Sequence, residues 1–322
     1  MSEADNGGKK ILLTGGAGGL GRIFAPRFVE AGHTVRVFDL PTPANKKRFT
    51  GKEPGIELFW GDITDAACVR EAARGMDEVF HLAALVFPAT EPVPEIARRV
   101  NVDGTQNVIN AVAEESEKRG TPVPIRFSSS VTVHGITSHL EPPIRVDHPL
   151  TPTNVYTETK IKGEELIRNS GLDWTIYRFA ATVYLEIRTG DFGTMKKIPA
   201  DCRAEFAHLY DVCTALLNTI GNPEAVGGIF PLGGGKRCQM LYRDQLKMIF
   251  DLFGFPEPNW KKFTHEPFAL DWYDTTEAQR VLNFQNHTME QYIEDFKRAM
   301  GMKYYAIHYA AAPLLRLFRV HL

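Results

Sequence analysis

The sequence has few of the features that mark metal-binding, disulfide-rich, membrane-spanning or nucleic-acid-binding proteins. Its 322 residues include only four cysteines, scattered along the chain without the spacing of a metal site or a redox motif. No apolar run reaches about 18 residues, so we expect no membrane-spanning helix. The formal net charge is only −2, which gives no indication of a nucleic-acid partner. We therefore expect a protein of the reducing cytoplasm without a metal site.

The composition is otherwise ordinary for a soluble globular protein, with 43% hydrophobic and 24% charged residues. A chain of 322 residues can bury a sizeable core, as one large domain or as one domain with a smaller lobe. Residues 1–8 are polar and are expected to be disordered, and no apolar signal region follows them.

Short apolar runs alternate with longer helical patterns in residues 9–181. A helical pattern such as residues 95–118 separates consecutive runs. This alternation predicts βαβ units, and therefore an α/β fold with a Rossmann-like, doubly wound parallel sheet. The six runs, which are rich in strand-forming residues, are 9–14, 33–39, 56–62, 77–83, 123–129 and 174–180.

The alternation ends after Ala181. Residues 204–221 are typical of a strand that turns into a helix, and residues 241–254 of an amphipathic helix that ends at Gly254. We expect residues 182–303 to form mainly a small substrate-binding lobe. It should lie over the carboxyl ends of the strands, where open α/β sheets bind their ligands.

A glycine-rich turn follows the first predicted strand and opens a helix. Gly15, Gly18 and Gly21 form a GxxGxxG pattern, with Gly19 and Leu20 inside it. Glycines let the backbone approach a pyrophosphate, and the helix N-terminus supplies amide donors. The pattern predicts a dinucleotide-binding loop, although an ordinary βα turn would also use glycine.

Asp39 ends the second predicted strand, 18 residues after Gly21. A carboxylate at this point can accept both ribose hydroxyls and repels a 2′-phosphate. The sequence therefore predicts NAD(H) as the cofactor, rather than NADP(H). A plain surface carboxylate is the alternative.

The third and fourth predicted strands end where such a fold meets adenine and the second ribose. Asp62 and Ile63 follow the third strand, and Leu82, Ala83 and Ala84 follow the fourth. We expect these residues to contact the cofactor. Asp62 could instead cap the helix that begins near residue 65.

Tyr156 and Lys160 lie four residues apart in a predicted helix, so their side chains share a face. Ser130 ends a predicted strand 26 residues upstream of Tyr156. A phenol can transfer the proton of an alcohol while hydride moves to or from nicotinamide. We expect the Lys160 ammonium to lower the pKa of Tyr156 and to hold the nicotinamide ribose, and Ser130 to orient the substrate oxygen. A solvated helix face and a polar strand end are the alternatives.

With these motifs in order, the chain resembles the extended short-chain dehydrogenase/reductases, the NAD-dependent epimerase/dehydratase family. The resemblance covers roughly residues 9–300. It implies that Ser130, Tyr156 and Lys160 are the catalytic triad and that Ser128 and Asn101 belong to the cofactor site. It also implies a homodimer built from helices around residues 95–117 and 152–170. The similar segments are residues 14–21, 101–108, 127–135, 154–165, 177–184, 208–216 and 274–285.

The chain departs from the family pattern at three places. Val131 and Thr132 stand where the 4,6-dehydratase branch has an Asp-Glu pair, so elimination of water is not expected. His134 replaces a tyrosine and is either a second acid/base group or a polar packing residue. The Tyr-Gly-Pro loop that shapes a nucleotide-sugar pocket is replaced at residues 184–186 by Tyr-Leu-Glu.

Residues at the strand ends are expected to line the substrate site, and most are apolar or aromatic. They are Val86, Phe87, Thr132, His134, Tyr184, Phe192 and Met195. Four cations in the same region, Arg188, Lys196, Lys197 and Arg203, could bind a diphosphate or a carboxylate, or could form a solvated surface. An apolar carbonyl compound and an anionic sugar nucleotide both remain open as the small-molecule substrate.

Residues 304–322 would form a helix with His308, Arg316 and Arg319 on one arc and mostly apolar residues elsewhere. Such a tail could lie on a membrane surface, or could dock on its own domain or on a partner subunit.

Three hypotheses for the function follow. The first is an NAD-dependent oxidoreductase that interconverts a secondary alcohol and a ketone. The second is a nucleoside-diphosphate-sugar epimerase that uses NAD transiently. The third, a non-catalytic NAD-sensing regulator, is disfavoured because the chain has the complete Ser-Tyr-Lys set.

Overall fold

The computed structural model describes residues 7–186, 195–311 and 313. Some sequence predictions concern residues outside these ranges. They are the expected disorder of the N-terminus over residues 1–6, the roles of Arg188 and Phe192, and the tail arginines Arg316 and Arg319.

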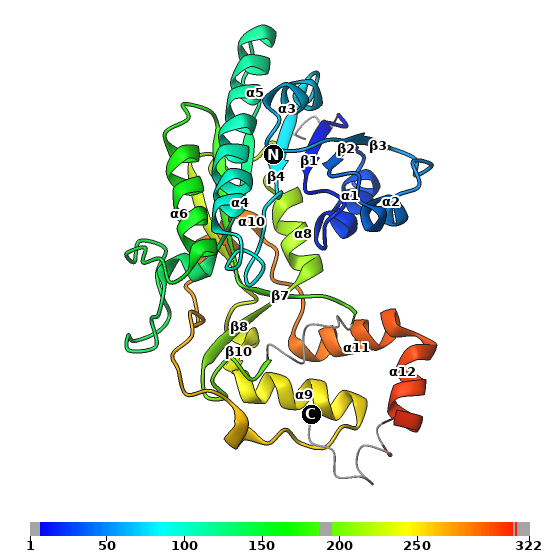
Figure 1. Ribbon diagram of the computed structural model, residues 1–322, viewed down its shortest axis with the longest axis vertical. Helices are drawn as coiled ribbons and strands as arrows, with labels where there is room; N and C mark the ends of the chain where they lie inside the picture. Colours follow the sequence, from blue (N-terminus) through cyan, green and yellow to red (C-terminus); the bar gives the residue numbers. More distant parts are fainter. Residues whose placement is uncertain (1–6, 187–194, 312, 314–322) are drawn as a thin grey trace.

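A seven-stranded sheet forms the centre of the molecule, and all its strand pairs are parallel (Figure 1). The strand order is β3-β2-β1-β4-β5-β6-β9, so the direction of winding reverses between β1 and β4. The predicted Rossmann-like sheet is therefore confirmed, and its six predicted strands are present. The strands are β1 (Lys10–Thr14), β2 (Thr34–Asp39), β3 (Ile56–Trp60), β4 (Glu78–His81), β5 (Ile125–Ser130), β6 (Trp174–Phe179) and β9 (Gly228–Leu232).

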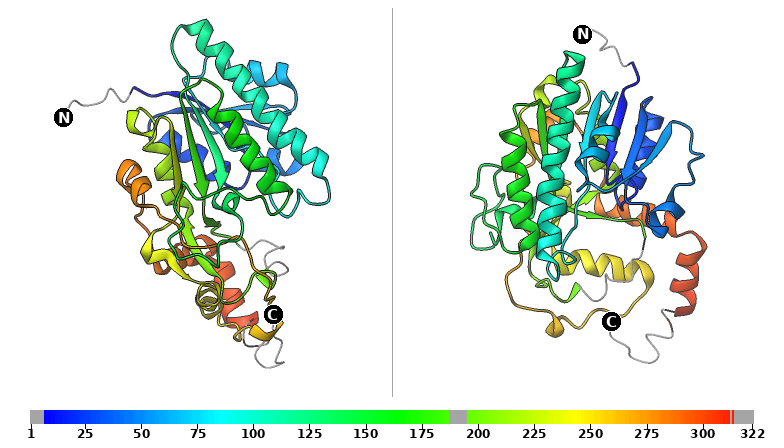
Figure 2. Two further views of the ribbon diagram at one scale, coloured as in Figure 1. Left: turned by 90° about the vertical axis from the view of Figure 1, so that its left-hand side faces the viewer. Right: turned by 45° about the horizontal axis from the view of Figure 1, so that its top comes forward.

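Helices cover both faces of this sheet (Figures 1 and 2). One face carries α3 (Ala66–Ala73), α4 (Pro94–Arg98), α5 (Gly104–Arg119) and α6 (Val155–Arg168). The other face carries α1 (Gly21–Glu30), α8 (Leu209–Leu217) and α10 (Thr276–Leu282). The connections include α2 (Pro43–Arg48) and the short helices η2 (Val131–His134) and η3 (Pro223–Ala225).

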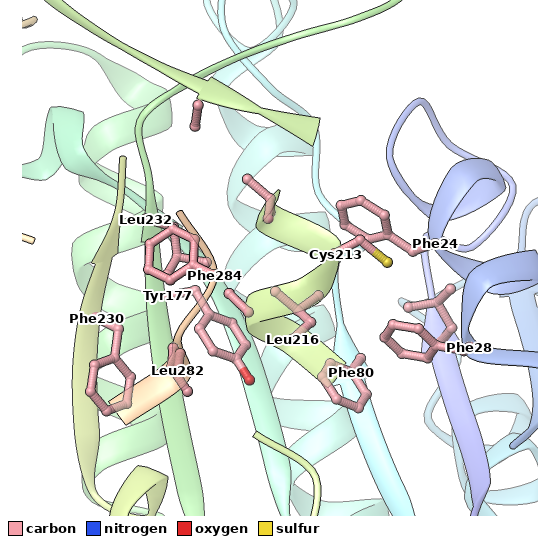
Figure 3. Packing of buried hydrophobic residues seen from close by; sticks show 14 of the residues in the cluster. Phe24, Phe28, Phe80, Tyr177, Cys213, Leu216, Phe230, Leu232, Leu282 and Phe284 are labelled. Atoms are coloured by element: carbon pink, nitrogen blue, oxygen red, sulfur yellow. The ribbon is translucent and has the colours of Figure 1, made fainter. Parts of the chain in front are cut away.

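Each face of the sheet has its own apolar core. Phe24 and Phe28 of α1 pack with Leu216 of α8 on one face (Figure 3). Val69 of α3 and Val112 of α5 belong to the core on the other face. Strand residues buried on both sides explain why the runs in the sequence are continuously apolar rather than alternating.

A small lobe lies beyond the carboxyl ends of the strands (Figures 1 and 2). Its three-stranded sheet has the order β10-β8-β7. The lobe has a core of its own, built around Phe250, Phe253 and Phe296. Its elements are β7 (Ala181–Val183), β8 (Arg203–His208), β10 (Gln239–Leu241), α9 (Tyr242–Phe253), α11 (Met289–Met300), α12 (Met302–Ala306) and the short helices η4 (Lys236–Cys238), η5 (Trp260–Lys262) and η6 (Ile307–Ala311).

After residue 181 the chain passes more than once between the small lobe and the large sheet. It returns to the large sheet with α8, β9 and α10, so residues 182–303 contribute to both the lobe and the large sheet with its helices. Among the described helices, none combines the length and the apolar character needed to span a bilayer.

Candidate active site

The glycine loop connects β1 to α1 and is packed tightly against β4. Gly15 has φ = +69°, and a Cβ there would lie 2.7 Å from the Ala83 amide nitrogen. Only glycine meets both conditions without strain. The Gly18 amide donates to the Gly15 carbonyl at 2.9 Å, which closes the turn before Gly21 begins α1. The loop therefore presents a helix N-terminus, the geometry that suits a pyrophosphate.

Asp39 ends β2 beside this loop. Its carboxylate accepts the Ala17 amide at 3.0 Å and the Leu40 amide at 2.8 Å. Burial raises the pKa of Asp39 above its ordinary value, while these amide donors act in the opposite direction. Arg48 of α2 donates to the Ala17 carbonyl at 2.8 Å, so a cation lies near Asp39.

The other predicted cofactor residues occupy the same edge of the sheet. Asp62 is exposed and accepts the amide and hydroxyl of Thr64, both at 2.9 Å. Asp65, rather than Asp62, caps α3, so the alternative role for Asp62 as the helix cap is not what the structure shows. Ile63 is buried near Gly104 of α5. The half-buried residues Leu82, Ala83 and Ala84 follow β4 beside the glycine loop.

Ser130, Tyr156 and Lys160 converge at the ends of β5 and α6. A capping box formed by Asn154 and Thr157 fixes the start of α6, and Tyr156 is the second residue of that helix. The hydroxyl of Ser130 lies 2.8 Å from the hydroxyl of Thr132, and Ser130 acts to lower the pKa of Tyr156. The Lys160 ammonium lies 5.9 Å from the centre of the Tyr156 ring.

The electrostatics of the pair differ from the sequence expectation. Burial raises the pKa of Tyr156 to about 12, with the Ser130 hydrogen bond acting in the opposite direction. Burial also lowers the pKa of Lys160 to about 7, against a raising contribution from Glu164. Lys160 donates to the Ser128 carbonyl at 2.6 Å. Desolvation of the phenol is the largest influence on its pKa, so the lowering expected from Lys160 is not what these protein groups produce.

Asn101 holds the loop after β4 rather than presenting free polar atoms to a ligand. It lies in a π-helical segment, η1 (Arg99–Asp103), between α4 and α5. Its amide accepts from the Leu85 nitrogen at 2.8 Å and donates to the Leu85 carbonyl and the Thr159 hydroxyl, both at 2.9 Å. These contacts brace the loop after β4 against α6, and the cofactor contact implied by the resemblance stays a prediction.

Ser128 also has its side chain directed into the protein. Its hydroxyl donates to the His81 carbonyl at 3.0 Å, and its own carbonyl accepts from Lys160. Its contribution to the site is thus made by the backbone, through the lysine, and its hydroxyl is engaged by β4.

A buried ion pair behind the triad was missed by the sequence analysis. Glu164, one turn after Lys160, receives two hydrogen bonds from Arg178, at 2.9 and 2.8 Å, and a third from Ser129 at 2.6 Å. Glu164 and Arg178 are both almost fully buried. The spacing of Tyr156, Lys160 and Glu164 at intervals of four residues was the signal that could have revealed it.

His134 belongs to this network and acts as a packing residue. Its Nε2 lies 3.1 Å from an Arg178 nitrogen, so that ring nitrogen accepts, and its Nδ1 donates to the His148 carbonyl at 3.1 Å. Burial, and secondarily Arg178, lower the pKa of His134 to about 4. A neutral ring with both nitrogens engaged is a poor second acid/base group, so the packing alternative is favoured.

The predicted substrate residues are only partly brought together. Phe87 and Val86 are exposed beyond β4, and Thr132 is bonded to Ser130. Met195 is buried in the core of the small lobe, which differs from its predicted exposure to substrate. Tyr184 lies against Gly19 of the glycine loop.

Arg203 matches neither of the two alternatives given for its cluster, an anion-binding group or a solvated surface, because it is paired within the protein. It makes a two-point ion pair with the buried Asp271, at 2.6 and 2.8 Å, and donates to the Leu140 carbonyl at 3.0 Å. The arginine is therefore engaged in fixing the loop that follows η2 against the lobe. Within the described ranges, no three His, Cys, Asp or Glu side chains are grouped so that they could hold a metal.

The architecture is that of a Rossmann-like α/β protein with a glycine loop of the dinucleotide-binding type. A match to the NAD dependent epimerase/dehydratase family covers residues 11–203. The chain belongs to this family, which confirms the resemblance seen in the sequence. The description of the family names NAD, in agreement with the cofactor predicted from Asp39 and the glycine loop.

Curated relatives include both dehydrogenases and epimerases. A 3-beta-hydroxysteroid dehydrogenase of Mycolicibacterium neoaurum is 31% identical over 170 residues, covering 49% of this chain and 42% of that protein. A UDP-glucose 4-epimerase of Lactobacillus helveticus is 30% identical over 177 residues, covering 53% of this chain and 51% of that protein. The match thus spans about half of each relative's length.

Solved structures show the same fold over almost the whole chain. A short-chain dehydrogenase/reductase superfamily protein from Agrobacterium tumefaciens with bound NAD has a TM-score of 0.72 at 24% identity, covering 96% of this chain and 99% of that one. The Bordetella bronchiseptica enzyme WbmG, in complex with NAD and UDP, has a TM-score of 0.78 at 19% identity, covering 95% and 98%.

Proposed function

We propose that the protein is an NAD-dependent oxidoreductase that interconverts a secondary alcohol and a ketone. The observation that carries this proposal is the convergence of Ser130, Tyr156 and Lys160 beside the glycine loop. The Gly15–Gly21 turn and Asp39 would hold the cofactor, and Lys160 would bind the ribose attached to its nicotinamide. Bound NAD would supply the hydride acceptor.

The roles of the three side chains follow from their contacts. Ser130 is placed to hydrogen-bond the substrate oxygen, because it ends β5, and β5 packs against α6, which carries Tyr156. Tyr156 would take the alcohol proton during oxidation and return it during reduction. Lys160, with a pKa lowered to about 7, can accept or release a proton near neutral pH, one helical turn from Tyr156.

The test is a substrate screen with the purified protein. Steroid, acyl and sugar-nucleotide alcohols would each be added with NAD, and the absorbance band of reduced nicotinamide would be followed. Net appearance of reduced cofactor with one class is the expected result. Tight NAD binding without turnover of any alcohol would contradict the proposal.

A sugar-nucleotide epimerase is the second candidate, because structural neighbours such as WbmG are described with NAD and UDP. The same Ser130, Tyr156 and Lys160 would serve it. Product analysis separates the two activities, because an epimerase converts its substrate without net change in reduced nicotinamide. The engagement of Arg203 by Asp271 and the exposed Phe87 and Val86 support the apolar ketone more than the diphosphate. A non-catalytic NAD sensor is the least supported candidate, since the triad is assembled.

We further propose a cytoplasmic homodimer that uses the helices around residues 95–117 and 152–170. Ile96 of α4 is 47% exposed, and Val102 of η1 and Ile161 of α6 line a hollow between these two elements. A second subunit that packs on these helices would cover the exposed Ile96 side chain. Sedimentation should show a dimer, and Ile96→Glu should shift the protein towards monomer without changing NAD binding.

Contact of residues 304–322 with a membrane surface is a separate proposal. Met302, Tyr305 and Tyr309 are 88%, 53% and 70% exposed, and their spacing places them on one helical face. The helix is docked on its other sides, since Tyr304 is buried in the core of the small lobe and His308 lies 3.0 Å from the Leu252 carbonyl. Co-sedimentation with anionic vesicles, at low and high salt, would compare the full chain with a variant lacking residues 304–322. If neither protein binds vesicles, the docked helix is the whole role of this segment.

A further inference from the structure

Tyr184 extends from the small lobe onto the glycine loop of the large sheet. A Cβ built at Gly19 would lie 2.6 Å from the Tyr184 hydroxyl oxygen and 2.8 Å from its ring. The three atoms nearest to that Cβ all belong to the Tyr184 side chain. The ring therefore occupies the space that any side chain at position 19 would need.

The segment around Tyr184 is held from both sides. The Tyr292 hydroxyl of α11 donates to the Tyr184 carbonyl at 2.8 Å. Two residues later, Glu186 forms an ion pair with Arg22 at the start of α1. The segment thus connects α11 of the small lobe to the helix that opens at the glycine loop.

The segment that carries Tyr184 begins beside the triad. Phe179, five residues before Tyr184, is the Cα partner of Ser130 in the large sheet. The cofactor's pyrophosphate belongs at the glycine loop, and its reacting ring belongs beside Tyr156. A side chain that starts near the end of β6, beside Ser130, and reaches Gly19 lies along the path of the nicotinamide riboside, which joins these two points.

We propose that Tyr184 is a cofactor-contacting residue, which lies beside the nicotinamide riboside and fixes its position from the small lobe. This inference rests on the proposed NAD-dependent function and reassigns Tyr184 from the substrate to the cofactor. Its ring offers a flat apolar surface, and its hydroxyl offers one hydrogen bond to the riboside. Gly19 is required because a side chain there would displace the ring.

Substitution of Gly19 tests the proposal, because the three atoms nearest to a Cβ at position 19 all belong to Tyr184. NADH binding would be measured by fluorescence titration, which needs no substrate. Tyr184→Phe removes the hydrogen bond and should weaken NADH binding about fivefold. Tyr184→Ala also removes the ring and should weaken it about tenfold or more. Gly19→Ala should weaken it about tenfold in the wild-type background but less than twofold in the Tyr184→Ala background.

Tyr242→Phe, which removes a phenol hydroxyl elsewhere in the small lobe, is the matched control and should bind NADH as the wild type does. Melting temperatures of all variants would be recorded, and Tyr184→Phe should melt within about 2 °C of the wild type. Unchanged binding in Tyr184→Ala, or an equal cost of Gly19→Ala in both backgrounds, would overturn the inference alone. Absence of NADH binding by the wild type would instead overturn the proposed function.

Discussion

The glycine loop and the small lobe hold their polar groups in different ways. At the loop, most contacts are made by the backbone, such as Gly15 to the Phe38 carbonyl at 2.8 Å and Gly18 to Gly15. In the lobe, buried side chains hold one another or nearby backbone. Arg203 is paired with Asp271, and Glu205 accepts from Gln239 at 3.0 Å and from the Tyr273 amide at 2.8 Å.

This difference separates two tasks. Backbone amides at a helix N-terminus recognise the phosphates that all dinucleotides share. The position of these amides depends on the course of the backbone and not on particular side chains. A lobe fixed by side-chain pairs can change its surface without disturbing that site. The cofactor half and the substrate half of the active site should therefore respond differently to substitution.

The largest effect is expected at Tyr156, the side chain proposed to transfer the proton. Tyr156→Phe removes the proton-transfer group and keeps the ring, so turnover should fall roughly a hundredfold or more. NADH binding, measured by fluorescence, should persist within a few-fold. Tyr210→Phe, on α8, would serve as the control with full activity. Retention of most activity by Tyr156→Phe would refute its assignment.

A second large effect is expected behind the triad, on stability. Glu164→Gln leaves the Arg178 cation buried without its counter-charge and should lower the free energy of unfolding by about 3 kcal/mol. Glu165→Gln, the next residue along α6, breaks a half-exposed pair with Lys162 and should cost at most about 0.5 kcal/mol. Denaturant titrations of the two variants would measure the difference. Equal losses would show that the buried pair has no special role.

The cofactor half can be tested at Asp39. Asp39→Ala removes the predicted acceptor of the ribose hydroxyls, and charge-assisted hydrogen bonds of this kind typically contribute about tenfold or more to affinity. NADH should bind correspondingly more weakly, and the preference over NADPH should narrow because Arg48 remains nearby. Wild-type protein that binds NADPH as tightly as NADH would contradict the role of Asp39.

Acid should weaken the fold gradually, because both parts of the molecule contain buried neutral histidines. Burial lowers the pKa to about 3 for His81, about 4 for His134 and about 3 for His208, from 6.5 in each case. The unfolded chain therefore binds these protons first, so stability is full above pH 6.5 and is lost as the pH falls towards 4. Melting temperatures across this range should decrease steadily. A flat profile between pH 6.5 and 4 would show that the rings are accessible in the fold.

The layout of the large sheet was predictable because it depends on local patterns. Parallel strands bring all their carboxyl ends to one edge, so Gly15, Asp39, Ser130 and Tyr156 could be placed near one another from order and spacing. The helical interval of four residues likewise placed Lys160 beside Tyr156.

Side chains whose partners lie far along the chain could not be placed in this way. Asp271, which engages Arg203, is 68 residues away, and no local pattern joins the two. The balance of desolvation against charge at Tyr156 also depends on burial that only packing decides. The contact of Tyr184 with Gly19 is of the same kind, because the two residues are far apart in the sequence and belong to different lobes.

The smallest effect is expected at Asp62, which matches Asp39 in residue type and follows the neighbouring strand. Its carboxylate is exposed and already accepts two hydrogen bonds from Thr64, whereas Asp39 is anchored to the glycine loop. Asp62→Asn keeps a hydrogen-bond acceptor for both Thr64 and an adenine amino group. NADH affinity should therefore change by no more than about twofold, as expected when an exposed group exchanges partners with water. Isothermal titration of Asp62→Asn beside Asp39→Asn would make the comparison with the same chemical change. A loss at Asp62 equal to that at Asp39 would show that adenine recognition depends on charge, and that the cofactor half is not held mainly by its backbone.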